Sequence, residues 1–272
     1  MNIGVLSGKG GTGKTLISTN LALAMSGNYI DCDVEEPNGF IFLNPTNIDS
    51  KDVLVDYPTV DSTKCTLCGQ CVSICEFNAL AKSKKIFIFE TLCHSCGACE
   101  MICPTNALKY EKRRIGKIDE GKYKDIKCIQ GTLNIGEAMA VPVVKELLRN
   151  LPDKLNIIDC SPGTSCNVVT SLEYIDKAIL VTESTEFGLH DLKRAVELCK
   201  KLNVSYGVVI NRSTDDKTLI HQYCEDENIK ILSTIPYSKE IAEIYSKGEL
   251  LVETDKYKDI FINLGEKLRG WV

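Results

Sequence analysis

Cysteine is the residue type that most sets this sequence apart, with 14 cysteines in 272 residues. Eight of them form two runs of identical spacing, C-x2-C-x2-C-x3-C, between residues 65 and 103. Each run closes with the same Asn-Ala-Leu, so the segments 64–80 and 92–108 form an internal repeat. Closely spaced thiolates are soft ligands that suit iron–sulfur clusters or zinc. The repeat therefore predicts a small metal-binding module.

The spacing resembles that of bacterial ferredoxins with two 4Fe–4S clusters, in which the fourth cysteine of each run ligates the other cluster. The resemblance implies two mixed ligand sets, one of Cys65, Cys68, Cys71 and Cys103 and the other of Cys93, Cys96, Cys99 and Cys75. The first run departs from the pattern, because Glu76 stands where the second run has Pro104. That proline is not a ligand, so two cubanes are still expected. Zinc is the alternative, since CxxC pairs also bind zinc.

A second motif lies near the N-terminus, where residues 8–15 read GKGGTGKT and fit G-x4-G-K-S/T. In such a loop the glycines let backbone N–H groups surround phosphate oxygens, the lysine reaches the β- and γ-phosphates, and the hydroxyl binds Mg²⁺. An apolar run precedes the motif and a helical pattern follows it, which is the required context. The residues expected around ATP or ADP are Gly8, Lys9, Gly10, Gly11, Thr12, Gly13, Lys14, Thr15 and Leu16.

The additional lysine, Lys9, makes this loop resemble the deviant Walker A motif of the MinD/ParA/Mrp ATPases and the nitrogenase iron protein. That resemblance implies that Lys9 reaches across a dimer interface and stabilises charge on the partner's nucleotide. It also implies acidic switch I residues at Asp31 and Asp33, with Asp33 the better candidate for positioning water or the Mg²⁺ shell. Asp159 matches the Walker B aspartate that binds Mg²⁺, and the turn at 162–163 resembles switch II. We therefore expect the catalytic residues to be Lys9, Lys14, Asp33 and Asp159.

Further positions follow from the same resemblance. Asn211 and Pro236 fall where relatives contact adenine, although Asn at a strand end is also common in turns. In the nitrogenase iron protein a cysteine seven residues after the Walker B aspartate ligates a cluster shared by two chains. Cys166 stands seven residues after Asp159, and Cys128 stands 31 residues before Asp159. Two chains would supply four thiolates for a third cluster; the alternative is that Cys166 packs on its helix and Cys128 is incidental. The other cysteines are expected to be buried small hydrophobes.

The elements around these motifs predict the fold. Short apolar runs alternate with helical patterns, which indicates an α/β protein with a mostly parallel sheet covered by helices on both faces. The cysteine repeat interrupts that order. We therefore expect a P-loop ATPase domain at 1–57 and 112–272 and an inserted α+β ferredoxin-like domain at 58–111. Residues 112–138 are expected to form a connector with short β-structure.

Composition narrows the function classes. The net charge is −5 and no long basic run occurs, so nucleic-acid binding is not expected. Neither a secretory signal nor a transmembrane segment is recognisable, which predicts a cytoplasmic protein, and oxygen-sensitive clusters would suit an anaerobic prokaryote. The C-terminal helix carries Ile260, Phe261, Leu264 and Leu268, which suit packing on the sheet as well as a membrane surface.

Together these features predict an ATP-hydrolysing iron–sulfur protein that forms a homodimer or a heterodimer with a paralogous ATPase. The expected role is metallocluster assembly or transfer to an apo metalloprotein, because ATP binding would close the dimer and hydrolysis would reopen it through the switches. The alternative is ATP-gated electron transfer to a redox partner. A positioning ATPase of the MinD/ParA type is less favoured, since a ferredoxin insert has no purpose there.

Overall fold

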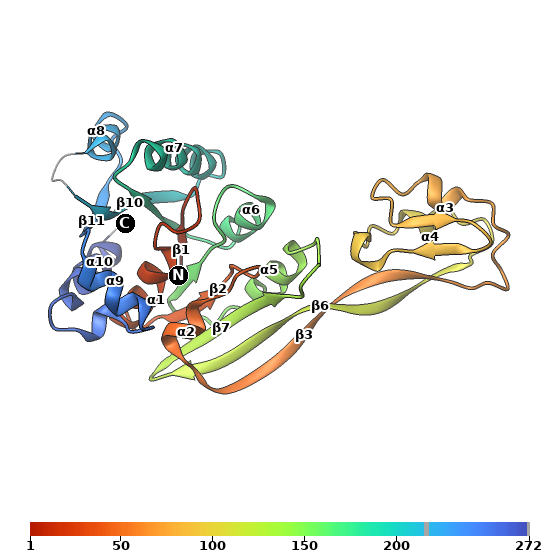
Figure 1. The fold of residues 1–272 in the computed structure, drawn as a ribbon, viewed down its shortest axis with the longest axis horizontal. Coiled ribbons are helices and arrows are strands. Elements are labelled where there is room, and N and C mark those ends of the chain that lie inside the picture. Colours follow the sequence, from red (N-terminus) through yellow and green to blue (C-terminus); the bar gives the residue numbers. More distant parts are fainter. Residues whose placement is uncertain (215–217, 271–272) are drawn as a thin grey trace.

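The computed structural model describes residues 1–214 and 218–270, which form a large α/β lobe and a small cysteine-rich lobe. Two long strands leave the large lobe side by side and carry the small lobe at their far end (Figure 1). The small lobe thus lies well apart from the helices that cover the main sheet.

The main sheet has nine strands in the order β11-β10-β9-β1-β8-β2-β7-β6-β3. All neighbours from β11 to β7 pair in parallel, and only β6 and β3 at one edge are antiparallel. The parallel strands are β1 (Asn2–Leu6), β2 (Asn28–Asp31), β7 (Ile126–Leu133), β8 (Asn156–Asp159), β9 (Lys177–Glu183), β10 (Ser205–Ser213) and β11 (Ile231–Pro236). The predicted α/β class with a mostly parallel sheet is confirmed.

Helices cover both faces of this sheet, and each face has its own apolar core. One face carries α5 (Val141–Leu148), α6 (Cys166–Leu172), α7 (Glu186–Lys201) and α8 (Leu219–Asp226). The other carries α1 (Lys14–Ala24), α2 (Gly39–Leu43), α9 (Lys239–Ser246), η2 (Leu251–Glu253) and α10 (Lys258–Arg269). Phe261, Leu264 and Leu268 of α10 are buried in that second core, so this helix packs on the sheet. No helix within the described ranges is long and apolar enough to cross a membrane.

The two strands of the ribbon are β3 (Thr46–Val60) and β6 (Leu108–Tyr123), which pair antiparallel over most of their length. The prediction of only short β-structure after residue 112 was therefore wrong, because β6 is followed closely by β7 and both are long. Charged residues dominate β6, and only the part around Ile115 packs in the first core, so most of the strand does not need the apolar alternation that marks a covered strand.

Between Val60 and Leu108 the small lobe contains α3 (Gln70–Ser73), β4 (Leu80–Lys82), β5 (Ile86–Ile88), η1 (Glu90–Leu92) and α4 (Ala98–Met101). Its buried cluster is small and consists of Cys71, Ala79, Leu80, Ile86, Cys93, Cys99 and Leu108. The strands β3 and β6 pass through the expected domain boundaries near 58 and 111, so the ribbon belongs to both lobes.

Candidate functional site

The phosphate-loop motif connects the end of β1 to the start of α1, and its backbone explains its glycines. Gly11 and Gly13 have φ angles of 78° and 94°, a left-handed region that favours glycine. Gly8 is required by a close approach instead, since a Cβ there would lie 2.5 Å from the backbone oxygen of Asp191 in α7. The loop therefore exposes backbone N–H groups ahead of α1, as an anion-binding loop needs.

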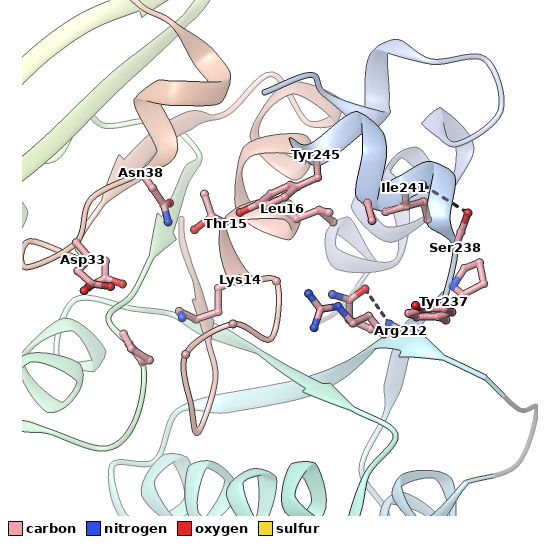
Figure 2. A pocket seen from close by; sticks show the side chains of 18 residues that line it. Lys14, Thr15, Leu16, Asp33, Asn38, Arg212, Tyr237, Ser238, Ile241 and Tyr245 are labelled. Carbon is pink, nitrogen blue, oxygen red and sulfur yellow. Dashed lines mark hydrogen bonds between the residues drawn. The ribbon is translucent and has the colours of Figure 1, made fainter. Parts of the chain in front are cut away.

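This loop forms one wall of a cavity of about 310 Å³ at the carboxyl ends of the parallel strands (Figure 2). Near the loop the lining is polar, and farther away it is largely apolar. The polar side consists of Gly10, Gly11, Gly13, Lys14, Thr15, Asp33, Glu36 and Asn38. The opposite side includes Pro236, Tyr237, Ile241, Ala242 and Tyr245, with Leu16 beside them. A triphosphate suits the first part and a planar base suits the second.

Two buried charged side chains, Lys14 and Asp159, lie beneath the loop. Lys14 and Asp159 are almost completely buried, and Lys14 opposes the effect by which burial raises the pKa of Asp159. Within the described residues, Oδ1 of Asp159 has no hydrogen-bond partner. An orphaned buried carboxylate oxygen beside a lysine and a threonine hydroxyl is costly unless a cation or ligand completes it. The residues therefore fit a Mg²⁺ ion bound with nucleotide phosphates.

The two switch I candidates have different surroundings. Asp31 is fully buried and accepts hydrogen bonds from the backbone N–H groups of Asp33, Asn38 and Gly39, at 3.1, 3.2 and 2.9 Å. Its carboxylate thus holds the loop that leads into α2. Asp33 lines the cavity, where burial raises its pKa to about 6 although Lys14 lowers it. Of the two, Asp33 is the one placed to meet a ligand.

Lys9 does not line the cavity of its own chain. Its ammonium lies 3.2 Å from a carboxylate oxygen of Glu183 at the end of β9, and its side chain is 38% exposed. The other oxygen of Glu183 pairs with Arg212 at 2.7 Å. Lys9 is therefore held at the rim of the site. Its action on a partner's nucleotide stays a prediction.

Asn211 and Pro236 both line the cavity. The side-chain amide of Asn211 donates to the carbonyl of Thr12 at 2.8 Å, and its oxygen accepts from the N–H of Arg212. Asn211 thus braces the phosphate loop from β10, and a contact with adenine stays a prediction. The sequence reasoning missed Glu183 and Arg212, whose charges have no motif to mark them.

The eight cysteines of the small lobe are divided between two cavities. The first cavity is lined by Cys65, Cys68, Cys71 and Cys103. The second is lined by Cys75, Cys93, Cys96 and Cys99. Each cavity thus combines three cysteines of one run with the last cysteine of the other run.

The internal repeat has a structural reason. Asn78 and Asn106 adopt left-handed φ angles of 53° and 49°, which Asn tolerates better than most residues. The N–H groups of Ala79 and Ala107 then lie 3.3 Å from the sulfurs of Cys75 and Cys103. The shared Asn-Ala-Leu therefore places one N–H on the fourth cysteine of each run. Such hydrogen bonds are typical of thiolates that hold iron–sulfur clusters.

Further sulfur contacts lie in both cavities, since the hydroxyl of Thr105 lies 3.8 Å from the sulfur of Cys103 in the first. The hydroxyl of Tyr110 in β6 lies 3.3 Å from the sulfur of Cys99, and the N–H of Ser95 lies 3.5 Å from that of Cys93. In the part of the chain that the structure describes, no three His, Cys, Asp or Glu side chains converge as they would on a single metal ion. The cavities are candidate cluster sites on the strength of their lining residues.

The structure does not bring Cys128 and Cys166 together. Cys128 in β7 is 0% exposed and belongs to the core beneath α1, paired in register with Tyr29 of β2. Cys166 is exposed at the start of α6. A ligand shared between two chains has to reach the surface, and Cys128 does not, so this arrangement offers no support for a third cluster. The remaining cysteines, Cys32, Cys160, Cys199 and Cys224, are buried.

Three comparisons place the chain among known proteins. A sequence model described as the CobQ/CobB/MinD/ParA nucleotide binding domain matches residues 3–252. An uncharacterized protein of Methanocaldococcus jannaschii is 34% identical over 281 residues, covering all of this chain and 97% of the relative. A cytosolic Fe–S cluster assembly factor, the NUBP1 homolog of Caenorhabditis briggsae, is 28% identical over 42% of this chain and 44% of its own length. The septum site-determining protein MinD of Pyrococcus horikoshii, solved with Mg-ADP, shares the fold with a TM-score of 0.61 at 18% identity, covering 98% of this chain and 95% of MinD.

Proposed function

The chain belongs to the CobQ/CobB/MinD/ParA nucleotide-binding family. We propose that this P-loop ATPase of the MinD/ParA type holds two 4Fe–4S clusters, and that ATP drives either their assembly or transfer or the electron transfer from them. The observation that carries the proposal is the sorting of eight cysteines into two cavities of four, each drawn from both runs. Eight thiolates in two such sets match the demand of two cubanes.

ATP is proposed to bind in the cavity at the phosphate loop, with its phosphates at the loop and its base toward Pro236 and Tyr245. Lys14 neutralises phosphate charge, and Thr15 and Asp159 are the side chains that would hold Mg²⁺. The bound ion would supply charge neutralisation at the phosphates. We propose that Asp33, which lines the same cavity, orients the attacking water.

Lys9 supports a dimer as the working form. A chain that used Lys9 on its own nucleotide would direct it into its own cavity, whereas the ammonium is held outside by Glu183. In a dimer around two nucleotides, Lys9 would exchange Glu183 for phosphate oxygens of the partner's ATP. ATP binding and dimer closure are then linked through one cation.

For the biological role, metallocluster assembly or transfer is the first proposal. It is supported by the partial likeness to proteins described as cytosolic Fe–S cluster assembly factors, including the NUBP1 homolog above and a Nubp2 homolog of Anopheles gambiae that is 29% identical over 41% of this chain. An apo metalloprotein would be the client.

ATP-gated electron transfer is the second proposal, and a specific observation favours it. Each cavity already contains four cysteines of this chain, so each proposed cluster is fully ligated and suited to remain in place. The ribbon of β3 and β6 links that lobe to the nucleotide lobe, where closure could present it to a redox partner.

Anaerobic reconstitution separates these roles. The loaded protein is incubated with a cluster-free acceptor, with and without ATP, and the iron on each protein is counted after separation. Iron that moves to the acceptor supports assembly. Iron that stays, with electrons that reach a partner only when ATP is present, supports electron transfer. A chain that binds ATP but no iron under reconstituting conditions would refute the proposal of an iron–sulfur ATPase.

A further inference from the structure

Tyr29 is a buried phenol in the strand β2, next to the nucleotide site. It lies in β2 with 0% of its surface exposed. Its hydroxyl is 3.2 Å from Oδ2 of Asp31 and 3.1 Å from Oδ2 of Asp159. A buried hydroxyl is costly unless it is hydrogen-bonded, so the phenol is retained together with these two carboxylates.

The strand geometry explains the contact. Side chains two residues apart on a strand lie on the same face, so Tyr29 and Asp31 project together toward α1 and α2. Asp31 and Asp159 are register partners on the neighbouring strands β2 and β8. The phenol therefore lies along β2 and contacts both carboxylates at the ends of β2 and β8, on the side of the sheet that α1 covers.

The phenol and Asp31 also contact the loop from Asp33 to Gly39. Oδ2 of Asp31, which the phenol approaches, also accepts the N–H groups of Asn38 and Gly39. A Cβ at Gly39 would lie 2.0 Å from the tyrosine hydroxyl, so the start of α2 rests directly on the phenol. The same loop supplies Asp33, Glu36 and Asn38 to the cavity wall.

We propose that Tyr29 is a positioning residue that fixes the Asp159 carboxylate and connects it to this loop. Its hydroxyl donates to Oδ2 of Asp159, whereas Oδ1 has no hydrogen bond among the described residues, although the hydroxyls of Thr15 and Ser18 also approach this carboxylate. Because a phenol has one proton, it donates to one carboxylate at a time. A change in the orientation of Asp159 therefore changes the hydrogen bond of the phenol to Asp31, and with it the N–H groups that Asp31 accepts. The inference rests on the proposed Mg²⁺–nucleotide site.

The test removes the hydroxyl and keeps the ring. In Tyr29→Phe, the affinity for ATP without Mg²⁺ stays within about twofold, because the phosphate loop is untouched. The Mg²⁺ concentration that half-saturates nucleotide binding rises by about tenfold, the lower end of the effect of removing a partner of a metal ligand. The kcat falls while KM for ATP at saturating Mg²⁺ is nearly unchanged. Tyr123→Phe is the matched control, because that phenol bonds Glu253 outside the cavity.

Amide exchange provides a readout that does not depend on activity. In the wild type, adding Mg²⁺ to the nucleotide-bound protein slows exchange at the N–H groups of Asn38 and Gly39, and in Tyr29→Phe this response is lost. Gly39→Ala displaces the phenol from the other side and raises the Mg²⁺ requirement in the same way.

Three results would overturn the inference. One is a folded Tyr29→Phe with an unchanged Mg²⁺ requirement. Another is a variant that loses stability while its Mg²⁺ dependence stays that of the wild type, which marks an ordinary core residue. The third, which needs no variant to fold, is a wild type whose exchange at Asn38 and Gly39 does not respond to Mg²⁺. If the wild type binds no Mg²⁺–nucleotide at all, or Lys14→Ala binds it equally well, the proposed nucleotide site fails instead.

Discussion

The nucleotide lobe and the cysteine lobe are stabilised in different ways. The nucleotide lobe has an apolar core on each face of its sheet, and these cores bury Lys14, Asp31 and Asp159 beneath the site. The cysteine lobe has one apolar cluster of seven buried residues, three of which are cysteines, and its two α-helices have four residues each. Domains this small usually need disulfides or metal to fold. We therefore expect the nucleotide site to form when its lobe folds, and the cysteine lobe to need bound metal in order to fold.

The largest expected effect is that of removing the metal. Anaerobic chelation of the reconstituted protein should unfold residues 61–107, because binding free energy at such sites is folding free energy. The nucleotide lobe should keep its affinity for ATP within about twofold. Hydrogen exchange read along the chain, together with a nucleotide titration, checks both halves of the prediction. A cysteine lobe that stays equally protected without metal would contradict the comparison.

The converse change acts on the nucleotide lobe alone. Lys14→Ala should abolish ATP binding, since it removes the one buried cation at the phosphate loop among the described residues and leaves Asp159 without its neighbour. Iron content should stay at the wild-type value, because the cysteine lobe has its own ligands. Calorimetric titration and iron analysis of the same sample make the measurement. ATP affinity equal to that of the wild type would refute the role given to Lys14.

A third change should affect only one of the two proposed clusters of the cysteine lobe. Cys75→Ser should remove or convert the cluster in the second cavity, although Cys75 belongs to the first run, and should leave the other cluster's EPR spectrum intact. Cys199→Ser is the control, since Cys199 is buried in α7 far from either cavity in sequence. Loss of the first cluster alone would show that each run ligates its own cluster.

The candidate site was predictable where a backbone conformation or a metal dictates residue types. The phosphate loop needs glycines at its left-handed positions, and the cysteine runs need fixed spacing, so both were visible in the sequence. The ribbon was not, because β6 is charged along much of its length, and only its middle, around Ile115, is covered by α5 and needs apolar residues. The count of residues that suggested Cys128 as a ligand could not reveal which face of β7 it occupies. Tyr29 could have been noticed, since it precedes Asp31 by two residues on the same strand.

A smaller effect should distinguish the two proposed clusters. The hydroxyl of Tyr110 would donate to the thiolate of Cys99 and stabilise the reduced, more negative cluster in the second cavity. A net hydrogen bond of about 0.5–1.5 kcal/mol corresponds to about 20–60 mV for a one-electron couple. Tyr110→Phe should therefore lower that cluster's potential by up to this amount and leave the other unchanged in an EPR-monitored redox titration. An equal shift of both clusters, or none, would argue against a selective role for Tyr110.

A pH dependence of stability is also expected in the nucleotide lobe. Burial raises the pKa of Asp33 to about 6, whereas in the unfolded chain it lies near 3.8. The native state therefore binds this proton more tightly, and the contribution of Asp33 to the free energy of unfolding is lost as pH rises from about 4 through 6. Denaturant titrations of the wild type and Asp33→Asn should diverge in that window and run parallel above it. Curves that stay parallel throughout would show that Asp33 is not buried in this way.

The central claim is that one chain holds an ATP site and two cubane sites. Anaerobic purification, followed by metal and sulfide analysis and quantitation of bound nucleotide on the same sample, tests it most directly. The account predicts eight iron atoms and eight sulfides per chain, as two cubanes require, with one nucleotide that Lys14→Ala loses. Zinc in place of iron at the cysteine lobe, without sulfide, would contradict it.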